Sequence, residues 1–322
     1  MNPHLVVNPA SAGGRTGRRL EALLREVRAE LGPCEYAFTE APGHGARLAR
    51  EAAQAGSPLV VAVGGDGTAS EVVDGLVAAA AAGHDAAFGF LPGGTGSDLR
   101  RSLDVPRDLA GAARGLAQGV DRRCDVGRVE LATRGGGRLE RSFVNVAGFG
   151  VAGRVVEITE RLGKALGGTL TYLLAGAGAL VGWSDPPVRW RVDGGPWREE
   201  RITSVSVCNG RFFGGGMLVA PEARLDDGLF DVVVWKGLGL ADLALKRRML
   251  YDGSHVRLPQ TEVLRARTLE AEPVGEARVL LDVDGDPAGL LPARFTLLPG
   301  ALRVRVPAQA SAHAARQAPA RD

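Results

Sequence analysis

The 322-residue chain is longer than most single domains, and 45% of its residues are hydrophobic, enough to bury one large core or two ordinary ones. Its 39 basic and 37 acidic residues nearly cancel, so the net charge of +2 provides no broad basic face and argues against a nucleic-acid partner. The three cysteines lie far apart, which fits neither a disulfide framework nor a zinc site and favours a reducing cytoplasm.

The first third of the chain alternates short apolar runs with helical patterns. This alternation predicts a parallel sheet covered by helices. A small polar loop over residues 8–17 separates the first strand from the first helix. The expected strands are 5–7, 35–39, 59–63 and 86–91, and the expected helices are 18–31, 46–55, 70–82 and one that starts near 96 or 97.

Beyond about residue 123, extended runs are separated by Gly-rich or polar turns, which predicts a mainly β second half with a helical interruption over 151–180. We therefore expect an α/β domain over 1–123, a β-rich domain over 124–306 and a disordered tail over 307–322. The last strand, 301–306, is compatible with packing on either domain. The uncharged stretch 165–183 approaches the length of a bilayer span, but five glycines and two threonines interrupt it. A buried or membrane-touching helix is therefore expected there.

The segment Gly64-Gly65-Asp66-Gly67-Thr68 follows an apolar strand and opens a helix. Backbone N–H groups and the positive end of a helix converge on a phosphate at such a place, and glycines allow the close approach. The alternative is a tight turn, because Asp-Gly is common in turns. However, Asp66 would repel a phosphate unless it holds Mg²⁺ or accepts a proton. Both are roles that a phosphotransferase needs.

A second glycine loop, Pro92-Gly93-Gly94-Thr95-Gly96, follows the next strand and precedes Asp98. In a doubly wound sheet, ligands bind where such loops gather at the carboxyl ends of the strands, so the two loops are expected to face one crevice. Taken alone, this second loop would be only a turn followed by a helix cap.

Two acidic clusters, 226–231 and 282–286, lie in the β-rich half. Adjacent carboxylates before a strand hold a hard cation, but an Asp-Gly pair is also an ordinary hairpin signal, which we slightly favour for either cluster. A Gly-x-Gly-x-x-Gly match at 148–153 lacks the acidic residue about twenty positions later that a dinucleotide site requires.

These motifs, in this order and spacing, resemble the diacylglycerol kinase catalytic family, in particular its bacterial lipid kinase branch, which is related to sphingosine and ceramide kinases. The resemblance runs from Val6 to about Val306. The matching segments are 8–11, the loop 64–68 with Glu71, Gly94-Thr95 with Asp98, 145–150, 214–221, 226–228 and 284–286.

The resemblance implies an α/β domain of the NAD kinase and diacylglycerol kinase type, a β-sandwich-like second domain, and ATP-dependent phosphorylation of a lipid hydroxyl in a cleft between them. It also implies Mg²⁺ as a cofactor. The residues that it assigns to nucleotide binding are Thr39, Gly64, Gly65, Asp66, Gly67, Thr68, Ala69, Ser70 and Thr95.

By the same resemblance, Asp227 and the backbone carbonyls of Arg224 and Leu229 would hold a structural Mg²⁺. Asp286 stands where the family usually has a glutamate that accepts the proton, whereas in the sphingosine kinase branch the loop acid, here Asp66, has that role. The sequence leaves the choice between the two carboxylates open.

Three residues depart from the family pattern. Ser97 replaces the usual asparagine, Asp286 is one methylene shorter than glutamate, and Arg100 replaces a small residue and adds charge beside the expected cleft. Two alternatives remain at this level: an NAD kinase-like enzyme for a small molecule, and a nucleotide- or lipid-binding protein without catalysis. The second-half motifs over 214–228 favour a lipid acceptor.

A lipid substrate implies peripheral contact with the inner face of the membrane by a cytoplasmic protein. The apolar stretch 165–183 and Phe212-Phe213 are candidates for that contact, and the basic run 246–248 would add attraction to anionic lipid. Plain core and a solvated helix face are the competing interpretations. The sequence leaves open whether the chain acts alone or as a homodimer.

Overall fold

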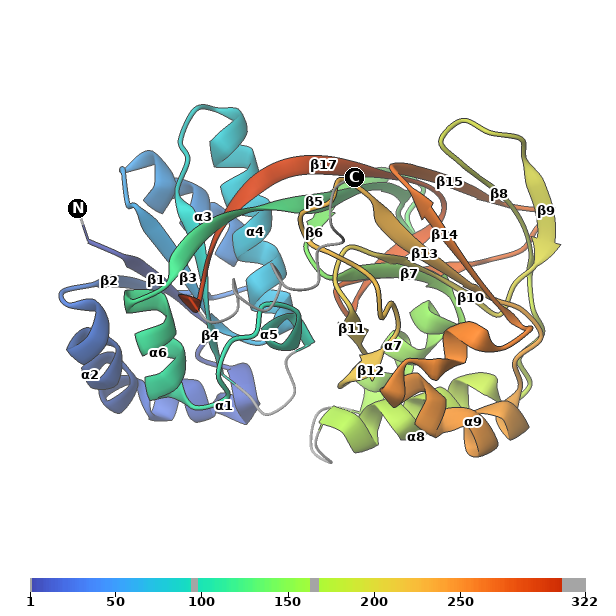
Figure 1. The fold of residues 1–322 in the computed structure, drawn as a ribbon, viewed down its shortest axis with the longest axis horizontal. Coiled ribbons are helices and arrows are strands. Elements are labelled where there is room, and N and C mark those ends of the chain that lie inside the picture. The colour runs from blue at the N-terminus through green and yellow to red at the C-terminus, as the bar shows by residue number, and fades with distance from the viewer. Residues whose placement is uncertain (1, 94–97, 163–167, 309–322) are drawn as a thin grey trace, which may run out of the picture. The chain divides into compact units, whose positions relative to one another are not determined.

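The computed structural model describes residues 2–93, 98–162 and 168–308 (Figure 1). The chain divides into two units: the first comprises Met1–Cys124 and Gly300–Asp322, and the second comprises Asp125–Pro299. The sequence-based boundary kept residues up to 306 in the second domain. In the structure, the end of β17 (Asp286–Val306) returns to the first unit, because Val304 pairs in parallel with Phe88 of β4.

The sheet of the first unit is parallel and has the order β17–β4–β3–β1–β2. Every residue of β3 is buried, as expected for a strand that is covered on both faces, and this explains its continuous apolar run. The strand bounds are β1 His4–Val7, β2 Glu35–Phe38, β3 Leu59–Gly64 and β4 Ala87–Pro92.

Helices follow each of these strands. The expected loop 8–17 instead contains α1, which is interrupted by three residues with left-handed backbone angles, Ala12, Gly13 and Gly14. The helix α4 begins four residues before its expected start, because Gly65 is an extended N-cap and the glycine after Asp66 continues the helix. The helix bounds are α1 Ser11–Arg18, α2 Leu20–Leu31, α3 His44–Gln54, α4 Asp66–Ala81, α5 Asp98–Ser102 and α6 Leu109–Ala117.

In the second unit, antiparallel strands β14, β13, β10, β7, β16 and the start of β17 lie side by side, and β15, β8, β9, β5 and β6 complete the β-rich part. Buried aromatic side chains fill its core, including Phe143, Phe149, Trp190, Phe230 and Phe295. The bounds are β5 Val120–Ala132, β6 Arg138–Phe143, β7 Val146–Gly150, β8 Pro187–Val192, β9 Arg198–Arg201, β10 Ser204–Cys208, β11 Phe212–Phe213, β12 Met217–Leu218, β13 Phe230–Trp235, β14 Thr261–Ala266, β15 Thr268–Pro273 and β16 Leu280–Val283.

Helices also belong to the second unit: α7 (Val151–Leu162), α8 (Gly168–Leu180), α9 (Leu240–Asp252) and the short 3₁₀ helix η1 (Ser254–Arg257). The predicted interruption over 151–180 is confirmed, whereas α9 was not predicted. Within the part of the chain that the structure describes, no helix combines the length and apolar character needed to cross a membrane. Residues 163–167 of the uncharged stretch lie outside the described residues.

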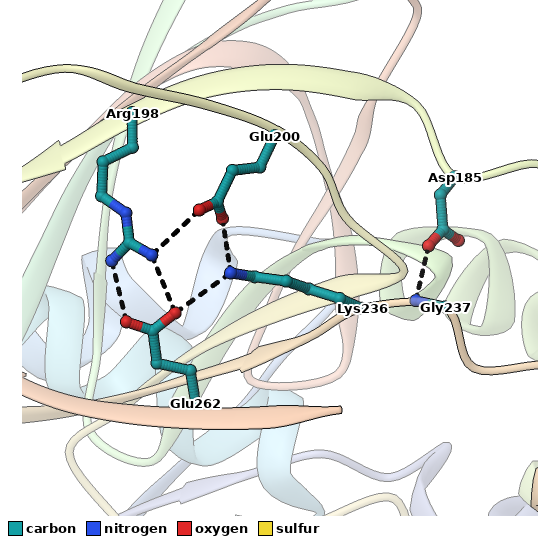
Figure 2. A network of polar contacts seen from close by, with 6 residues as sticks. All are labelled: Asp185, Arg198, Glu200, Lys236, Gly237 and Glu262. Atoms are coloured by element: carbon teal, nitrogen blue, oxygen red, sulfur yellow. Dashed lines mark hydrogen bonds and ion pairs between the residues drawn. The ribbon is translucent and has the colours of Figure 1, made fainter. Parts of the chain in front are cut away.

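A charged network joins β9, β14 and the residue after β13 (Figure 2). Arg198 donates to both carboxylate oxygens of Glu262, at 2.8 and 2.9 Å, and to Glu200 at 2.9 Å. Lys236 contacts the same two acids, at 2.7 and 3.1 Å. The hydrogen bonds from Arg198 lower the pKa of Glu262 to about 2. These side-chain contacts link β9 to β14.

Candidate active site

The glycine loop is formed by the end of β3 and the start of α4. A Cβ atom on Gly64 would lie 2.5 Å from the hydroxyl oxygen of Thr68, so no larger residue fits there. The first intrahelical hydrogen bond runs from Ala69 N to Gly65 O, at 3.1 Å. The N–H groups of Gly67 and Thr68 therefore precede it, at the positive end of the helix. This end can accept a phosphate.

The loop after β1 packs against the glycine loop. Asn8 Nδ2 donates to Thr68 Oγ1 at 3.1 Å, and Asn8 N donates to Val63 O at 3.0 Å. The loop after β4 lies equally close: a Cβ on Gly93 would be 2.8 Å from Ser11 Oγ and 3.0 Å from Gly64 Cα. The loops at the carboxyl ends of three parallel strands therefore meet, as the sequence predicted for the second and third of them.

Asp66 already has partners in the second loop. Its carboxylate accepts hydrogen bonds from Asp98 N at 3.1 Å and from Leu99 N at 3.2 Å, and thereby caps the start of α5. The buried carboxylate of Asp98 accepts from Arg101 Nη1 at 2.7 Å. The sequence assigned Asp66 to metal or proton chemistry; its capping role was not foreseen.

Arg100 is directed at its own loop. Its Nη1 donates to the backbone oxygen of Val105 at 2.8 Å. Burial, followed by the nearby Arg101 and Arg107, lowers the pKa of this guanidinium. Its departure from the family pattern thus has a local structural use.

Glu71, on the second turn of α4, binds the loop after β2. Its two carboxylate oxygens accept from Gly43 N and Gly45 N, both at 2.8 Å, at the start of α3. A Cβ on Gly45 would be 2.7 Å from Glu71 Oε2 and 3.6 Å from Thr39 Cγ2. Glu71 therefore fixes the loop that contains Thr39, whose own N–H donates to Val7 O at 2.9 Å.

The remaining residues assigned to the nucleotide differ in accessibility. Ala69 and Ser70 are fully buried in α4, so their side chains face the interior of the first unit. Thr95 and Ser97 lie outside the described residues. The structure thus brings Asn8, Gly64 to Thr68 and Glu71 together around the start of α4.

In the second unit, the acidic cluster 282–286 forms the β16–β17 hairpin. Asp284 and Gly285 both have positive φ, 48° and 83°, and Val283 pairs with Asp286, which confirms the Asp-Gly hairpin. The Asp284 carboxylate accepts N–H bonds from residues 144, 145 and 146, at 3.2, 3.1 and 3.0 Å. Asp284 is thus committed to the backbone before β7, and Asp286 is half-buried at the first position of β17.

Asp282 is buried on β16. Only 5% of the residue is exposed, and its Oδ1 atom has no hydrogen-bond partner. Burial raises the pKa of Asp282 to about 8, with further contributions from Asp284 and Asp286. This carboxyl group therefore carries a proton at neutral pH.

The expected Mg²⁺ loop lies before β13. Asp227 pairs with Arg265, and its Oδ1 accepts from Leu229 N at 3.2 Å. Asp125, which the sequence analysis missed because no motif marks it, accepts from Gly228 N through Oδ2 at 2.7 Å. Among the described residues, no group of three or more His, Cys, Asp or Glu side chains is arranged as a metal cluster. The predicted site, with one carboxylate and two backbone carbonyls, does not depend on such a group.

Comparisons with known proteins cover both units. The diacylglycerol kinase catalytic domain matches residues 2–129, and the YegS C-terminal NAD kinase beta sandwich-like domain matches 145–306. A diacylglycerol kinase of Bacillus subtilis is 30% identical over 94% of this chain and 95% of its own. A YegS-like lipid kinase of Pseudomonas aeruginosa is 32% identical over 94% of both chains. A Bacillus anthracis crystal structure described as a diacylglycerol kinase shares the fold, with a TM-score of 0.69 and 23% identity over 95% of this chain and 96% of that chain.

Proposed function

The chain belongs to the family of diacylglycerol kinases and YegS-like lipid kinases and is a lipid kinase, and on this premise we propose that it transfers the γ-phosphoryl group of ATP to a hydroxyl of a diacylglycerol-like or sphingoid lipid. The observation that carries the proposal is the match of both family domains, in order, to the two halves of the chain. The relatives are lipid kinases by name, which speaks against the NAD kinase-like and non-catalytic alternatives.

The ATP phosphates are expected at the start of α4. Support comes from the N–H groups of Gly67 and Thr68, which precede the first intrahelical bond, and from Gly64, where a side chain would collide with Thr68. Thr39, in the loop held by Glu71, is the expected contact on another side of the nucleotide. Thr95 completes the proposed set.

The loop 224–229 suits Mg²⁺, because its proposed ligands are oxygen atoms only: the Asp227 carboxylate and the backbone carbonyls of Arg224 and Leu229. Arg265 pairs with the Asp227 carboxylate, so Mg²⁺ bound there would share that carboxylate with the guanidinium or replace it. When bound, Mg²⁺ would neutralise negative charge and order the loop that Asp125 holds through Gly228.

Asp286 is our choice for the group that accepts the proton of the lipid hydroxyl. Two backbone N–H groups already bind the carboxylate of Asp66, and three bind that of Asp284. These bonds hold Asp66 at the start of α5 and Asp284 at the backbone before β7, which gives both carboxylates a positioning role. Asp286 stands where the family usually has the glutamate that accepts the proton, and this supports it as the acceptor.

Radiolabelled ATP tests the proposed reaction in separate assays with diacylglycerol, sphingosine, ceramide, phosphatidylglycerol and NAD. We expect label on one or more of the lipids. Label on NAD alone would contradict the lipid assignment, and transfer to none of the five acceptors would favour a binding protein.

A lipid acceptor also fixes where the enzyme works. Its substrate is held in a bilayer, so we place the protein in the cytoplasm, in peripheral contact with the inner face of the membrane. Co-sedimentation of the protein with lipid vesicles measures this contact directly.

A further inference from the structure

Asn209 lies directly after β10 and is fully buried. Its side-chain Nδ2 donates to two backbone oxygens, Asp125 O and Val144 O, both at 2.9 Å. Both partners are acceptors, so this position needs two donor hydrogens on one atom, which the asparagine amide has and an ionised aspartate or a serine has not. The backbone N–H of Asn209 donates to Asn145 O at 2.9 Å. Asn209 therefore joins two segments that lie 84 and 65 positions away in the sequence.

The first of these segments holds the loop 224–229, which is the proposed Mg²⁺ site. Asp125 N donates to Leu225 O at 2.6 Å, and Asp125 Oδ2 accepts from Gly228 N at 2.7 Å. Asp125 is 3% exposed. Because Asn209 binds the backbone oxygen of the same residue, it fixes the position from which the loop is held.

The second segment holds the hairpin that contains Asp286. The N–H groups of residues 144–146 donate to the Asp284 carboxylate, and Asp284 N donates back to this segment at 2.9 Å. Asp284 lies two positions before Asp286 in the β16–β17 hairpin. Asn209 binds Val144 O, in the same segment. One buried amide thus connects the proposed Mg²⁺ loop to the hairpin of the proposed proton acceptor.

We propose that Asn209 is a positioning residue for phosphoryl transfer, which sets the distance between the loop 224–229 and the Asp286 hairpin; this inference rests on the proposed function. Asn209 acts on the loop through Asp125, and on the hairpin through residues 144–146 and Asp284. A residue that orients the surroundings of a metal site changes metal affinity or activity by about 10–100-fold. An asparagine with a purely structural role would change the stability of the protein and leave both quantities unchanged in the folded protein.

Calorimetric titration with Mg²⁺ alone, without ATP, and steady-state kinetics at saturating Mg²⁺ test the proposal. In Asn209→Ala, we expect the Kd for Mg²⁺ to rise and kcat to fall, each about ten-fold. The KM for ATP should stay unchanged, because the expected phosphate site at the start of α4 belongs to the first unit, whereas Asn209 and both its partners belong to the second. Asn209→Asp, which keeps the shape of the side chain but loses the NH₂ group, takes the place of Asn209→Ala if that variant does not fold.

Each of the two connections also has a variant of its own. Asp125→Ala removes the acceptor of Gly228 N and should weaken Mg²⁺ binding, with little change in kcat at saturating Mg²⁺. Asp284→Ala removes the acceptor of residues 144–146 and should lower kcat, with the Kd for Mg²⁺ unchanged. If both variants change the two quantities together, as Asn209→Ala does, the cause is a general loss of structure and the proposal fails.

Ser206→Ala is the matched control. Ser206 lies on the same strand, is 1% exposed, and its hydroxyl oxygen has no hydrogen-bond partner among the described residues. This variant should have the Mg²⁺ affinity and kcat of wild type. Wild-type values of both quantities in folded Asn209→Ala would overturn the proposal, and so would their equal loss in Ser206→Ala.

Hydrogen exchange without substrate separates this inference from the proposed function. The N–H groups of residues 144–146 and of Gly228, which bind the two carboxylates, should exchange faster in Asn209→Ala than in wild type or Ser206→Ala. Unchanged exchange at both places would contradict the positioning role. If wild type phosphorylates no lipid, the proposed function fails, and the Mg²⁺ titration and the hydrogen exchange still decide the role of Asn209.

Discussion

Asp66 and Glu71 lie on one helix, and each binds two backbone N–H groups of a neighbouring loop. Neither contact follows from a pattern in the sequence, because the partners are backbone groups 26 to 33 positions away. The sequence predicted the glycine residues of the site, since their need for close approach is local. It could not predict which carboxylates would accept hydrogen bonds from backbone N–H groups of other loops.

Glu71→Gln replaces one accepting carboxylate oxygen with an NH₂ group, which is a donor and cannot accept the N–H of Gly43 or Gly45. An unpaired N–H costs about 1–3 kcal/mol, so the loop with Thr39 should lose its fixed position. We expect the KM for ATP to rise about ten-fold, with a smaller change in kcat. Glu51→Gln, on the exposed face of α3, is the control and should leave both constants unchanged. An unchanged KM for ATP in Glu71→Gln would show that this loop does not contact nucleotide.

Asp286→Asn tests the proposed proton acceptor. General-base catalysis contributes about 10²–10⁴-fold, so kcat should fall by that factor while binding of ATP stays unchanged. Steady-state kinetics and nucleotide titration measure the two effects. Asp66→Asn should instead lower the melting temperature, because it disturbs the cap of α5. Near-normal kcat in Asp286→Asn would exclude this carboxylate as the base.

Asp282 makes stability depend on pH. Its pKa is raised to about 8 in the folded protein, against about 4 when unfolded. Between these values only the unfolded state has lost the proton, so the contribution of Asp282 to stability is fully present below pH 4 and is lost as pH rises toward 8, by up to about 1.4 kcal/mol per pH unit. Asp282→Asn should flatten this fall in urea unfolding measured from pH 4 to 8. The exposed Glu140→Gln should keep the wild-type slope, and a wild-type slope in Asp282→Asn would refute the assignment.

At the scale of elements, buried strands were predictable and the start and end of helices were not. The strand over 59–63 was placed within one residue, because both of its faces are covered and its sequence is uniformly apolar. The helix α9 was missed, since its residues show no continuous apolar face. The helix α1 was missed because its left-handed residues, Ala12 to Gly14, are characteristic of a loop.

The contact of α3 with α4 depends on Gly75. A Cβ at this position would lie 2.1 Å from the backbone oxygen of Ala46 and 2.9 Å from Ala49 Cβ. Gly75→Ala should therefore destabilise the protein by about 1–3 kcal/mol, despite the higher helix propensity of alanine. Chemical denaturation measures the loss. Gly135→Ala, where the added carbon meets nothing within 4 Å, should be neutral, and equal stability of the two variants would contradict this packing.

At the scale of the whole molecule, the first unit is not continuous in sequence. The chain leaves it after Cys124 and returns at Gly300, where the end of β17 pairs with β4. The sequence predicted a boundary near residue 123, where the texture of the pattern changes. It grouped the last strand with the second domain, although that strand was compatible with packing on either, since an isolated apolar strand carries no mark of its partner.

Residues 1–124 expressed alone should therefore aggregate or unfold without cooperativity, because β4 becomes an open edge. Joining residues 300–308 to this fragment through a flexible linker should restore a soluble unit. Light scattering and thermal unfolding by circular dichroism compare the two fragments. Equal cooperativity and melting temperature in both would show that the returning strand is dispensable.

The start of α4 also bears on where the first unit can bind an anion. Three helices, α3, α4 and α5, follow strands β2, β3 and β4 of one parallel sheet, and each helix start attracts negative charge. The Glu71 carboxylate accepts hydrogen bonds from backbone N–H groups at the start of α3, and the Asp66 carboxylate accepts them at the start of α5. The protein's own carboxylates therefore occupy two of these three helix starts. In the proposed ATP site, the start of α4 is therefore the one of these three helix ends whose backbone N–H groups remain for the phosphates.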